Sequence, residues 1–219
     1  MKTLTTLITI LFISLLSSPS WSETVSSWFD LVKREGIFYK KFSDVPFTGE
    51  VIEIKIGSGE YKSKGILKDG KQIGIWEYYD ENDKLRGKSN FKEGHRISTW
   101  EHYYENGKLW ERGNYKDGKR HGLWEDYYEN GKLEEKGNYK DDKKDGIWEY
   151  YNKNNGQLSF KKNYEDGEQD GLWEWYYNSD QLWYKGNVSN GQKDGLWEWF
   201  NEDGSLKKTE TWKNGVKVK

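Results

Sequence analysis

The sequence predicts an all-β fold in which tandem antiparallel β-hairpin repeats form an elongated, twisted single-layer sheet. Three observations lead to this prediction. One phrase recurs with a tryptophan every 24 or 25 residues, and turn-forming Asn-Gly and Asp-Gly pairs interrupt the chain between short aromatic runs. The chain also holds many aromatic rings and few aliphatic side chains, which suits a thin interior rather than a thick two-layer core.

The recurring phrase is clearest at residues 122–142, GLWEDYYENGKLEEKGNYKDD. A degenerate first copy begins at Phe47 and has Val51 in place of the tryptophan. Turn pairs are frequent and helical spacing of apolar residues is absent, so residues 47–217 are predicted to be an array of about seven hairpins. The tryptophans of the six full copies, 24, 24, 24, 25 and 24 residues apart, are Trp76, Trp100, Trp124, Trp148, Trp173 and Trp197.

The composition is polar yet rich in aromatic residues. Hydrophobic residues make up 33% of the chain and mean hydropathy is −1.12, but 17% of residues are aromatic, including 13 Trp and 16 Tyr. Disordered chains are poor in aromatic residues, and one buried ring removes about 150–250 Å² from water. The chain is therefore expected to fold, with its apolar area concentrated in a few large rings.

Charge and cysteine content exclude several classes of function. The 35 basic and 37 acidic residues are interleaved, for a net charge of −2. Without a basic stripe, neither nucleic-acid binding nor a polybasic membrane anchor is expected. The absence of cysteine excludes disulfides, thiolate metal sites, a cysteine nucleophile and a lipid-bearing N-terminal cysteine.

Residues 1–22 differ from the rest of the chain and are predicted to be a cleaved signal peptide. Lys2 precedes an apolar run over residues 4–16, and Ser20 and Ser22 offer the small residues that signal peptidase requires. The run is short for a membrane span, although an uncleaved N-terminal anchor is the alternative. The mature protein is expected in the periplasm or outside the cell, with residues 23–46 as an N-terminal cap segment.

The hairpin register follows from the turn. Asn130-Gly131 is predicted to be the centre of a two-residue type I′ loop, in which both residues need positive φ. Opposite charges then meet across the strands, and each tryptophan fills the space left by a glycine. The predicted pairs are Glu125 with Lys136, Trp124 with Gly137, Tyr128 with Leu133, and Gly122 with Tyr139.

Alternation of side chains separates two predicted faces. One face carries the tryptophan column together with Leu109, Leu133, Leu158 and Leu182. The other carries a row of Glu–Lys pairs and tyrosines such as Tyr103 and Tyr176. Each repeated glutamate has a Lys, Arg or Thr opposite, so these carboxylates are interpreted as cross-strand pairs and not as catalytic groups.

The unit resembles a MORN-type repeat, specifically the bacterial variant with the signature Gly-x-Trp-Glu-x-Tyr-Tyr-x-x-Asn-Gly-x-Leu. The resemblance covers roughly residues 36–217, with Ser98 in place of the first glycine in one copy. Residues 39–49 also resemble the segment with which such arrays begin. The chain is thereby identified as similar to the YwqK-like family, whose name as an antitoxin implies neutralising a partner protein by binding it.

No catalytic or metal-binding constellation is evident in the sequence. The histidines His95, His102 and His121 lack a third ligand at suitable spacing, and the Asp-Gly pairs are interpreted as turns. Motifs for serine nucleophiles, zinc peptidases and phosphate-binding loops are missing. The protein is therefore predicted not to be an enzyme and to need no cofactor or metal.

Aromatic residues that depart from the repeat are the candidates for binding a partner. The register places Trp110 opposite Tyr103 and Trp183 opposite Tyr176 on the charged face, as two Trp–Tyr pairs. Trp175 and Trp199 are further departures on the face of the tryptophan column. The alternative for all four tryptophans is additional packing within the ribbon.

These observations predict an exported, non-enzymatic scaffold that binds a partner protein, either a toxin or an envelope protein. A module that binds glycans or the cell wall through its Trp and Tyr rings is the first alternative. Binding to lipid headgroups is the second, although the basic patch that it would need is missing.

Overall fold

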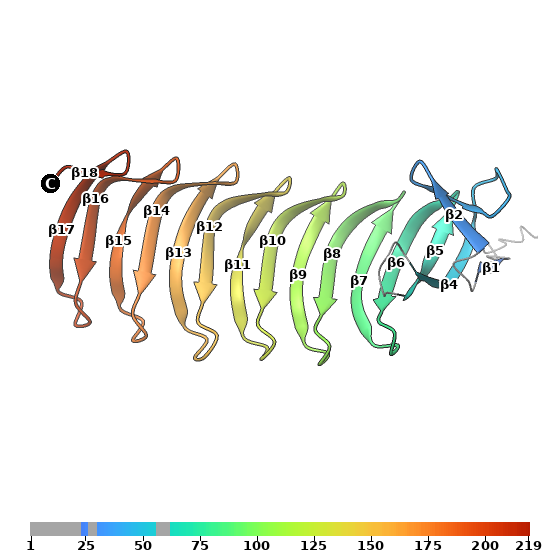
Figure 1. Cartoon of the computed structure of the whole chain (residues 1–219), viewed down its shortest axis with the longest axis horizontal. Coiled ribbons are helices and arrows are strands. Elements are labelled where there is room, and N and C mark those ends of the chain that lie inside the picture. Colours follow the sequence, from blue (N-terminus) through green and yellow to red (C-terminus); the bar gives the residue numbers. More distant parts are fainter. Residues whose placement is uncertain (1–22, 26–29, 56–61) are drawn as a thin grey trace, which may run out of the picture.

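The computed structural model describes residues 23–25, 30–55 and 62–219, and for residues 53–55 the backbone only. These residues form strands and turns, which confirms the predicted all-β fold (Figure 1). The predicted signal peptide lies outside the described residues. The strands are β1 (Thr24–Val25), β2 (Leu31–Arg34), β3 (Ile37–Lys40), β4 (Gly49–Lys55), β5 (Lys62–Lys68), β6 (Lys71–Tyr79), β7 (Leu85–Lys92), β8 (His95–Tyr103), β9 (Leu109–Lys116), β10 (Lys119–Tyr127), β11 (Leu133–Lys140), β12 (Lys143–Tyr151), β13 (Leu158–Glu165), β14 (Glu168–Tyr176), β15 (Leu182–Ser189), β16 (Gln192–Phe200), β17 (Leu206–Lys213) and β18 (Val216–Lys217).

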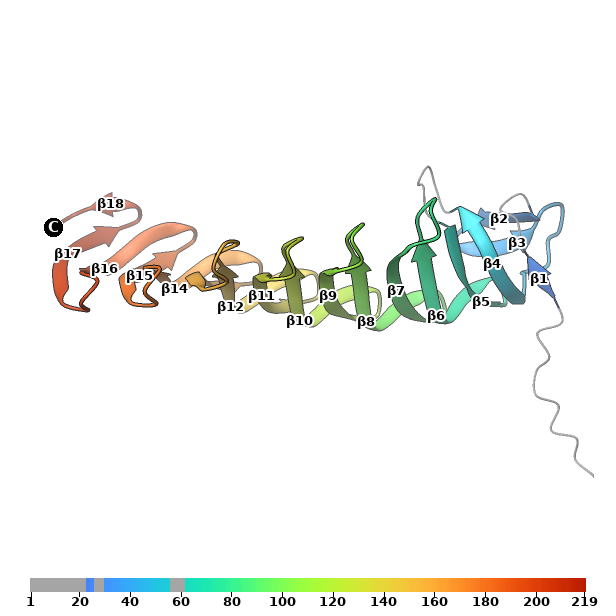
Figure 2. The same ribbon diagram turned by 90° about the horizontal axis from the view of Figure 1, so that it is seen from below.

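Sixteen of these strands form one open sheet in which β4 to β18 follow each other in chain order. The pairing is antiparallel throughout, except that β1 lies parallel to β4 at the first edge. Figures 1 and 2 show the result, a long twisted ribbon whose strands lie across its long axis. Each strand of the ribbon pairs only with its neighbours in the sheet, so stability accumulates locally along the ribbon.

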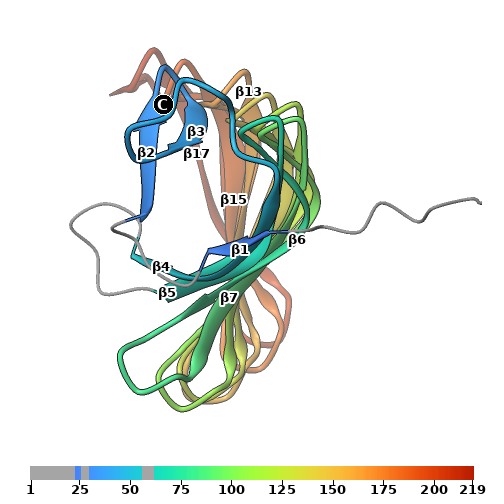
Figure 3. The same cartoon turned by 90° about the vertical axis from the view of Figure 1, so that its right-hand side faces the viewer.

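A short hairpin, β2–β3, forms a separate two-stranded sheet that caps the first strands of the ribbon. Figure 3 shows that the long strands are bent and that this hairpin lies on the inside of the bend. Phe38 donates its backbone N–H to the Gly70 carbonyl at 2.9 Å, which joins the hairpin to the β5–β6 turn. The buried cluster beneath it combines Leu31, Phe38, Val51, Leu67 and Trp76 with Val25, Phe47 and Phe91.

The two ends of the hairpins use different turns, and the predicted type I′ turn is at the other end from Asn130-Gly131. The β11–β12 loop has two residues, Asp141 and Asp142, with φ of 51° and 72°, as a type I′ turn requires. Every described two-residue loop of the array is of this kind. The β10–β11 loop instead has three residues: Gly131 donates to the Tyr128 carbonyl at 2.7 Å, and only Gly131 has positive φ.

This three-residue loop corrects the register near the turn. Tyr127, and not Tyr128, lies opposite Leu133, and a bulge before the next pair restores the predicted register. Asn-Gly suits both turn types because a single left-handed glycine is enough for the longer loop. In the copy with one extra residue the loop has four residues, since Asn152 donates to the Gln157 carbonyl at 2.8 Å. The predicted pairs Glu125–Lys136, Trp124–Gly137 and Gly122–Tyr139 are confirmed.

A second bulge, near the middle of every other strand, bends the sheet. In β10, residues 121–123 face the single residue Asn114 of β9, and Gly122 has φ of 83°. Extra residues on one strand bend and twist it. Ser98 takes the same left-handed conformation in the copy without this glycine. Trp76 packs in one buried cluster with Leu31 and Phe38 of the hairpin inside the bend (Figure 3), so the inside, called the concave face here, carries the tryptophan column. The glutamate after each tryptophan points the other way, so the outside, called the convex face, carries the Glu–Lys row.

The corrected register moves the leucines to the convex face. Leu109 lies opposite Tyr103, whose hydroxyl donates to Glu101 at 2.5 Å on that face. The predicted placement of the leucines beside the tryptophan column is therefore wrong for Leu109, Leu133, Leu158 and Leu182.

Four of the six column tryptophans cover the glycine of the preceding strand rather than a residue of their own hairpin: Trp76, Trp124, Trp148 and Trp197 lie over Gly65, Gly113, Gly137 and Gly186. Trp100 and Trp173 have Ser89 and Lys162 at this position instead. A Cβ added at Gly113 would lie 1.9 Å from the Trp124 ring, and one added at Gly137 would lie 2.3 Å from the Trp148 ring. The predicted contact of Trp124 with Gly137 is thus wrong, although the two residues are opposite in register. Trp124 has a glycine neighbour on both sides, and its side chain leans toward β9.

The ion pairs of the convex Glu–Lys row also form mainly with the preceding strand, as the tryptophan contacts do. Both Arg112 and Lys136 lie opposite Glu125, but the ion pair forms with Arg112 on the preceding strand. Equivalent pairs across four other repeat boundaries are Lys64–Glu77, Lys88–Glu101, Lys136–Glu149 and Lys185–Glu198. Lys161 is the exception, because it pairs with Glu149 of its own hairpin at 3.4 Å. Because such exposed pairs contribute only about 0.2–1 kcal/mol each, they serve mainly to align neighbouring repeats.

Candidate binding surface

Neighbouring three-residue loops are joined to one another at the long edge of the ribbon. The Tyr104 hydroxyl donates to the Tyr127 carbonyl at 2.7 Å, and Tyr128 repeats this contact with Tyr151 at 2.8 Å. Asn106 Nδ2 adds a hydrogen bond to the Glu129 carbonyl at 3.1 Å. Tyr177 makes the same contact with the Phe200 carbonyl at 3.0 Å, so these three tyrosines fix the loop edge in their copies, and side chains that rest on them have a firm support.

Trp110 and Trp183 rest on these tyrosines. Trp110 lies 5.7 Å from Tyr104 between ring centroids, and Trp183 lies 5.7 Å from Tyr177. The predicted partners Tyr103 and Tyr176 are wrong, since both tryptophans occupy the extra position of the bulge and turn to the concave face. Trp110 is 40% exposed and Trp183 43%, so each offers an open aromatic surface in a fixed position.

Trp175 and Trp199 lie on the concave face as predicted and belong to a continuous stack of rings across β12 to β16. Consecutive centroids are 4.4, 5.5, 4.7 and 6.2 Å apart, with interplanar angles between 16° and 28°. The faces of these rings cover one another, so mainly their edges are available to a ligand. The stack consists of Tyr150, Phe160, Trp175, Tyr184 and Trp199.

The register position that the stacked rings occupy in β12 to β16 carries acidic residues in the preceding strands, β9 to β11. Glu111, Asp126 and Glu135 occupy successive register positions on β9, β10 and β11. Burial and the two neighbouring carboxylates, Glu135 and then Glu111, raise the pKa of Asp126 to about 7. Trp100 and Trp124 donate their indole N–H groups to Glu111 at 2.9 Å and to Asp126 at 3.2 Å, respectively. The concave face therefore changes from acidic to aromatic along the ribbon.

The raised pKa of Asp126 predicts a pH-dependent stability. An unfolded Asp has a pKa of about 3.9, so the folded protein holds this proton more tightly, and the associated stability is lost as pH rises from about 4 through about 7. Asp126→Asn keeps an acceptor for Trp124 and removes the charge. Urea unfolding should show the variant more stable than wild type by about 1–2 kcal/mol at pH 8 and equal to it near pH 4. Asp117→Asn, in an exposed turn, is the control; if the Asp126→Asn difference were the same at both pH values, crowding of the carboxylates would be excluded.

Cations lie over the tryptophan column, one in most repeats. Lys144 Nζ is 3.6 Å from the centroid of Trp148, Arg96 is 4.3 Å from Trp100, and Lys193 is 4.1 Å from Trp197. Such contacts stabilise by about 0.5–2 kcal/mol and cover one side of the column. The six column tryptophans are thus architectural, with Trp76, Trp148 and Trp197 almost fully buried.

Two of the histidines lie beside carboxylates. His102 lies 3.6 Å from Glu111, and His121 lies 3.4 Å from Asp141. Among the residues that the structure describes, no group of three or more His, Asp or Glu side chains is placed to hold a metal ion. None of the described segments forms a helix that is long and apolar enough to cross a membrane.

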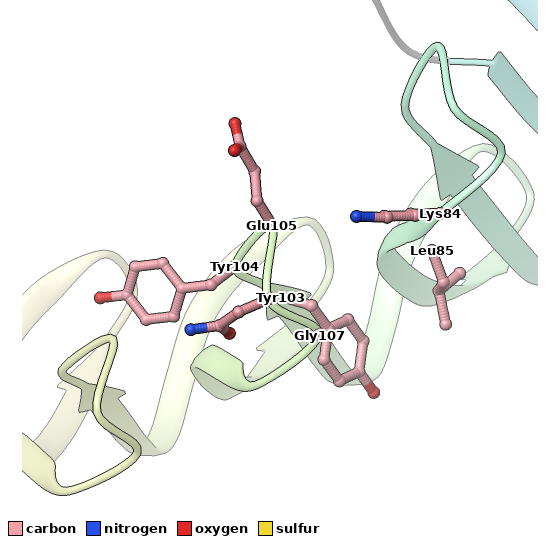
Figure 4. A pocket seen from close by; sticks show the side chains of 7 residues that line it. Lys84, Leu85, Tyr103, Tyr104, Glu105 and Gly107 are labelled. Carbon is pink, nitrogen blue, oxygen red and sulfur yellow. The ribbon is translucent and has the colours of Figure 1, made fainter.

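One surface depression of about 510 Å³ lies between the loops of β6–β7 and β8–β9 (Figure 4). It occurs where Asp80 replaces the tyrosine that joins neighbouring loops in the next copies. Asp80 binds Arg86 at 3.4 Å, and Arg86 Nε donates to the Tyr103 carbonyl at 3.1 Å in place of the missing tyrosine. The depression is open and lined by Lys84, Leu85, Tyr103, Tyr104, Glu105, Asn106 and Gly107.

Sequence reasoning missed the row that runs along the concave face. This row includes Phe160, Tyr184, Glu111 and Glu135, none of which stands out in the sequence. Only the register shows that they lie beside Asp126 or Trp175 on the neighbouring strands. A comparison of the second strand of each hairpin, residue by residue across copies, would have revealed them. The bulge that turns Trp110 to the concave face has no separate signal beyond the loop length.

These features define an open, single-layer β-hairpin repeat protein with an aromatic concave face. Five segments match the family model described as MORN repeat variant, and they are MORN variant repeats. The copy around Trp148, with the longer loop and with Lys162 at the glycine position, lies between the matched segments. The matched residues are 72–93, 98–117, 120–141, 169–190 and 193–214.

A comparison with curated proteins gives no match. Among solved structures, the chain is similar to TarM, with a TM-score of 0.30 and 19% identity over 47% of this chain and 19% of that chain. A second similar structure is a Staphylococcus aureus TarM variant in complex with fondaparinux, α-GlcNAc-glycerol and UDP, with a TM-score of 0.32 and 18% identity over 54% and 21% of the two chains. The chain thus spans about a fifth of the length of these proteins, and a likeness of this size does not bear on its function.

Proposed function

We propose that the protein is a non-enzymatic scaffold that binds a partner protein through half-exposed tryptophans on its concave face. The observation that carries this proposal is the pair Trp110 and Trp183, exposed to 40% and 43% and supported by Tyr104 and Tyr177. Large aromatic side chains in fixed positions are the residues that most often dominate protein–protein binding energy. Glu111, the residue after Trp110, already accepts a hydrogen bond from the Trp100 indole N–H at 2.9 Å and lies 3.6 Å from His102, so a partner would not meet it as an isolated charge.

The partner class follows from two sequence features. Residues 1–22 have the composition of an export signal, which favours a partner in the envelope or outside the cell. The resemblance to an antitoxin family favours, more narrowly, a toxin whose surface the ribbon would occupy. Glycan binding is less well supported, because the stacked rings cover the faces on which a sugar would stack.

Affinity capture with the purified protein tests the proposal. Envelope and culture-supernatant proteins of the producing bacterium are passed over the immobilised chain, and one protein should be retained specifically. The double variant Trp110→Ala, Trp183→Ala should lose it while its unfolding curve stays within about 1 kcal/mol of wild type, as expected for exposed side chains. Glu134→Ala, Lys207→Ala changes the same bulge position in copies without tryptophan and should retain the partner.

Two outcomes would reject the proposal. One is retention of the captured protein by the double alanine variant. The other is binding of the wild-type chain to peptidoglycan or an oligosaccharide array with no protein captured, which would favour the glycan-binding alternative. Identification of the captured protein as a toxin would support the narrower antitoxin assignment.

A further inference from the structure

An aliphatic row lies along the convex face, opposite the tryptophan column. Each member follows the left-handed residue at the mid-strand bulge, so it lies on the outside of the bend. Five members are Ile or Leu and are between 44% and 67% exposed. This row, called the ridge here, consists of Ile75, Thr99, Leu123, Ile147, Leu172 and Leu196.

The fold itself does not require an aliphatic side chain on the ridge. Thr99 occupies the position in one copy, with the same register to the next strand as in the other copies. A polar β-branched residue is therefore compatible with this backbone. Apolar residues that recur on an exposed surface and line up in one stripe usually mark an interaction site.

We propose that the ridge is the interface of a two-fold dimer, in which the convex faces of two copies of this chain meet. Ridge residues recur every second strand, a period of about 9.6 Å. A second copy has the same period and the same twist, so all ridge positions can engage at once. A partner without this period would contact only one or two of them.

The charges beside the ridge fit the same arrangement. Glutamates and basic residues alternate strand by strand along the flank, as in Arg112, Glu125, Lys136 and Glu149. A two-fold axis that runs along the strands, midway between two neighbouring strands, sets each Glu of one copy against a basic residue of the other. This axis also places each ridge strand of one copy against a strand without a ridge residue in the other. The aliphatic side chains of one copy therefore lie between those of its partner.

The size of the ridge predicts the strength of the dimer. From β6 to β16 the ridge crosses ten strand intervals of about 4.8 Å, so it is about 50 Å long and about 10 Å wide. Two such strips bury about 1,000 Å², the lower end for a specific interface. A dissociation constant in the micromolar range is expected, and the flanking charges should make it weaker at high salt.

Sedimentation velocity of the purified protein between about 1 and 100 µM tests this dimer. Wild type should change from monomer to dimer over this range. Leu123→Thr, Ile147→Thr, Leu172→Thr copies the natural Thr99 and should raise the dissociation constant at least about tenfold, with an unchanged circular dichroism spectrum. Thr99→Leu extends the ridge and should tighten the dimer.

A monomeric wild type at all concentrations would overturn the proposal, and so would a triple threonine variant that dimerises like wild type. In the first case the ridge would have to bind a different molecule. Trp110→Ala, Trp183→Ala should leave the dimer intact because both tryptophans face the concave side, so the dimer and the proposed partner binding can fail separately.

Discussion

Replacing Gly137 by valine is expected to lower the free energy of unfolding by about 3 kcal/mol, at the upper end for overpacking a core. A Cβ at this position would lie 2.3 Å from Cδ2 and 2.4 Å from Cε2 of Trp148. The indole is completely buried and lies between Tyr139 and Tyr164, so it has no open space to enter. Moving it would also break the hydrogen bond from its Nε1 to the Asn138 carbonyl at 3.1 Å.

Gly87→Val is the matched control in a urea unfolding series. A Cβ at Gly87 would lie 3.1 Å from the Trp100 ring and 3.1 Å from the Glu101 carbonyl, a tight contact that a small shift relieves. Its expected cost is about 1 kcal/mol. Gly113→Val and Gly186→Val should resemble Gly137→Val, since each glycine lies beneath a tryptophan of the next strand. Equal losses for Gly87→Val and Gly137→Val would show that the rings do not depend on the glycines.

Trp148→Ala is expected to cost about 3–5 kcal/mol, the range for truncating a buried aromatic side chain. The change removes the ring that covers Gly137 and two edge-to-face contacts, at 5.0 Å to Tyr139 and 6.4 Å to Tyr164. Lys144 would lose the aromatic face beneath its ammonium group as well. The loss should appear in urea unfolding monitored by far-ultraviolet circular dichroism.

Trp173→Ala is the comparison within the same column. Trp173 lies over Lys162 and not over a glycine, and it is only partly buried. Its truncation should cost about 1–2 kcal/mol less than that of Trp148. A double-mutant cycle adds a test of contact: Gly137→Val with Trp148→Val should cost less than the sum of the two, because the smaller side chain makes room. Strict additivity would contradict the Trp148–Gly137 contact.

Much of this ribbon could be predicted from the sequence because the same turn residues and the same alternation of side chains recur in each repeat. The period of the tryptophans gives the number of hairpins, and the alternation of side chains gives Glu125–Lys136 and Trp124–Gly137 as opposite residues in the register, which is confirmed. The degenerate copy at Val51 is also placed correctly, since Val51 is buried where a tryptophan would lie. These features depend on neighbours close in the chain.

The errors arose where one sequence permits two geometries. Asn130-Gly131 suits a two-residue or a three-residue loop, and the choice moves every residue near the turn by one position. That shift, with its bulge, turns Trp110 from the charged face to the concave face. Trp124 has glycines on both neighbouring strands, so the register alone does not decide which one its ring covers.

For the candidate binding residues, too, one part can be predicted from the sequence and another part follows only from the geometry of the loops and strands. Trp110 and Trp183 were found because they break the repeat, but their supporting tyrosines, Tyr104 and Tyr177, follow only from the loop geometry. Trp175 and Trp199 proved to be members of a longer stack whose other rings are ordinary in the sequence. Shared residues thus build the ribbon, and the residues that differ between copies give the concave face its individual surface.

Hydroxyl-radical footprinting of the protein, alone and with the captured partner, tests most directly whether the partner binds to the residues of the concave face that differ between copies. Trp110 and Trp183 are among the most exposed of the described tryptophans, so both should be oxidised in the free protein and protected in the complex. Buried column tryptophans such as Trp148 should react slowly in both states. Protection confined to the convex face or to the ends of the ribbon, with Trp110 and Trp183 oxidised as in the free protein, would contradict partner binding on the concave face.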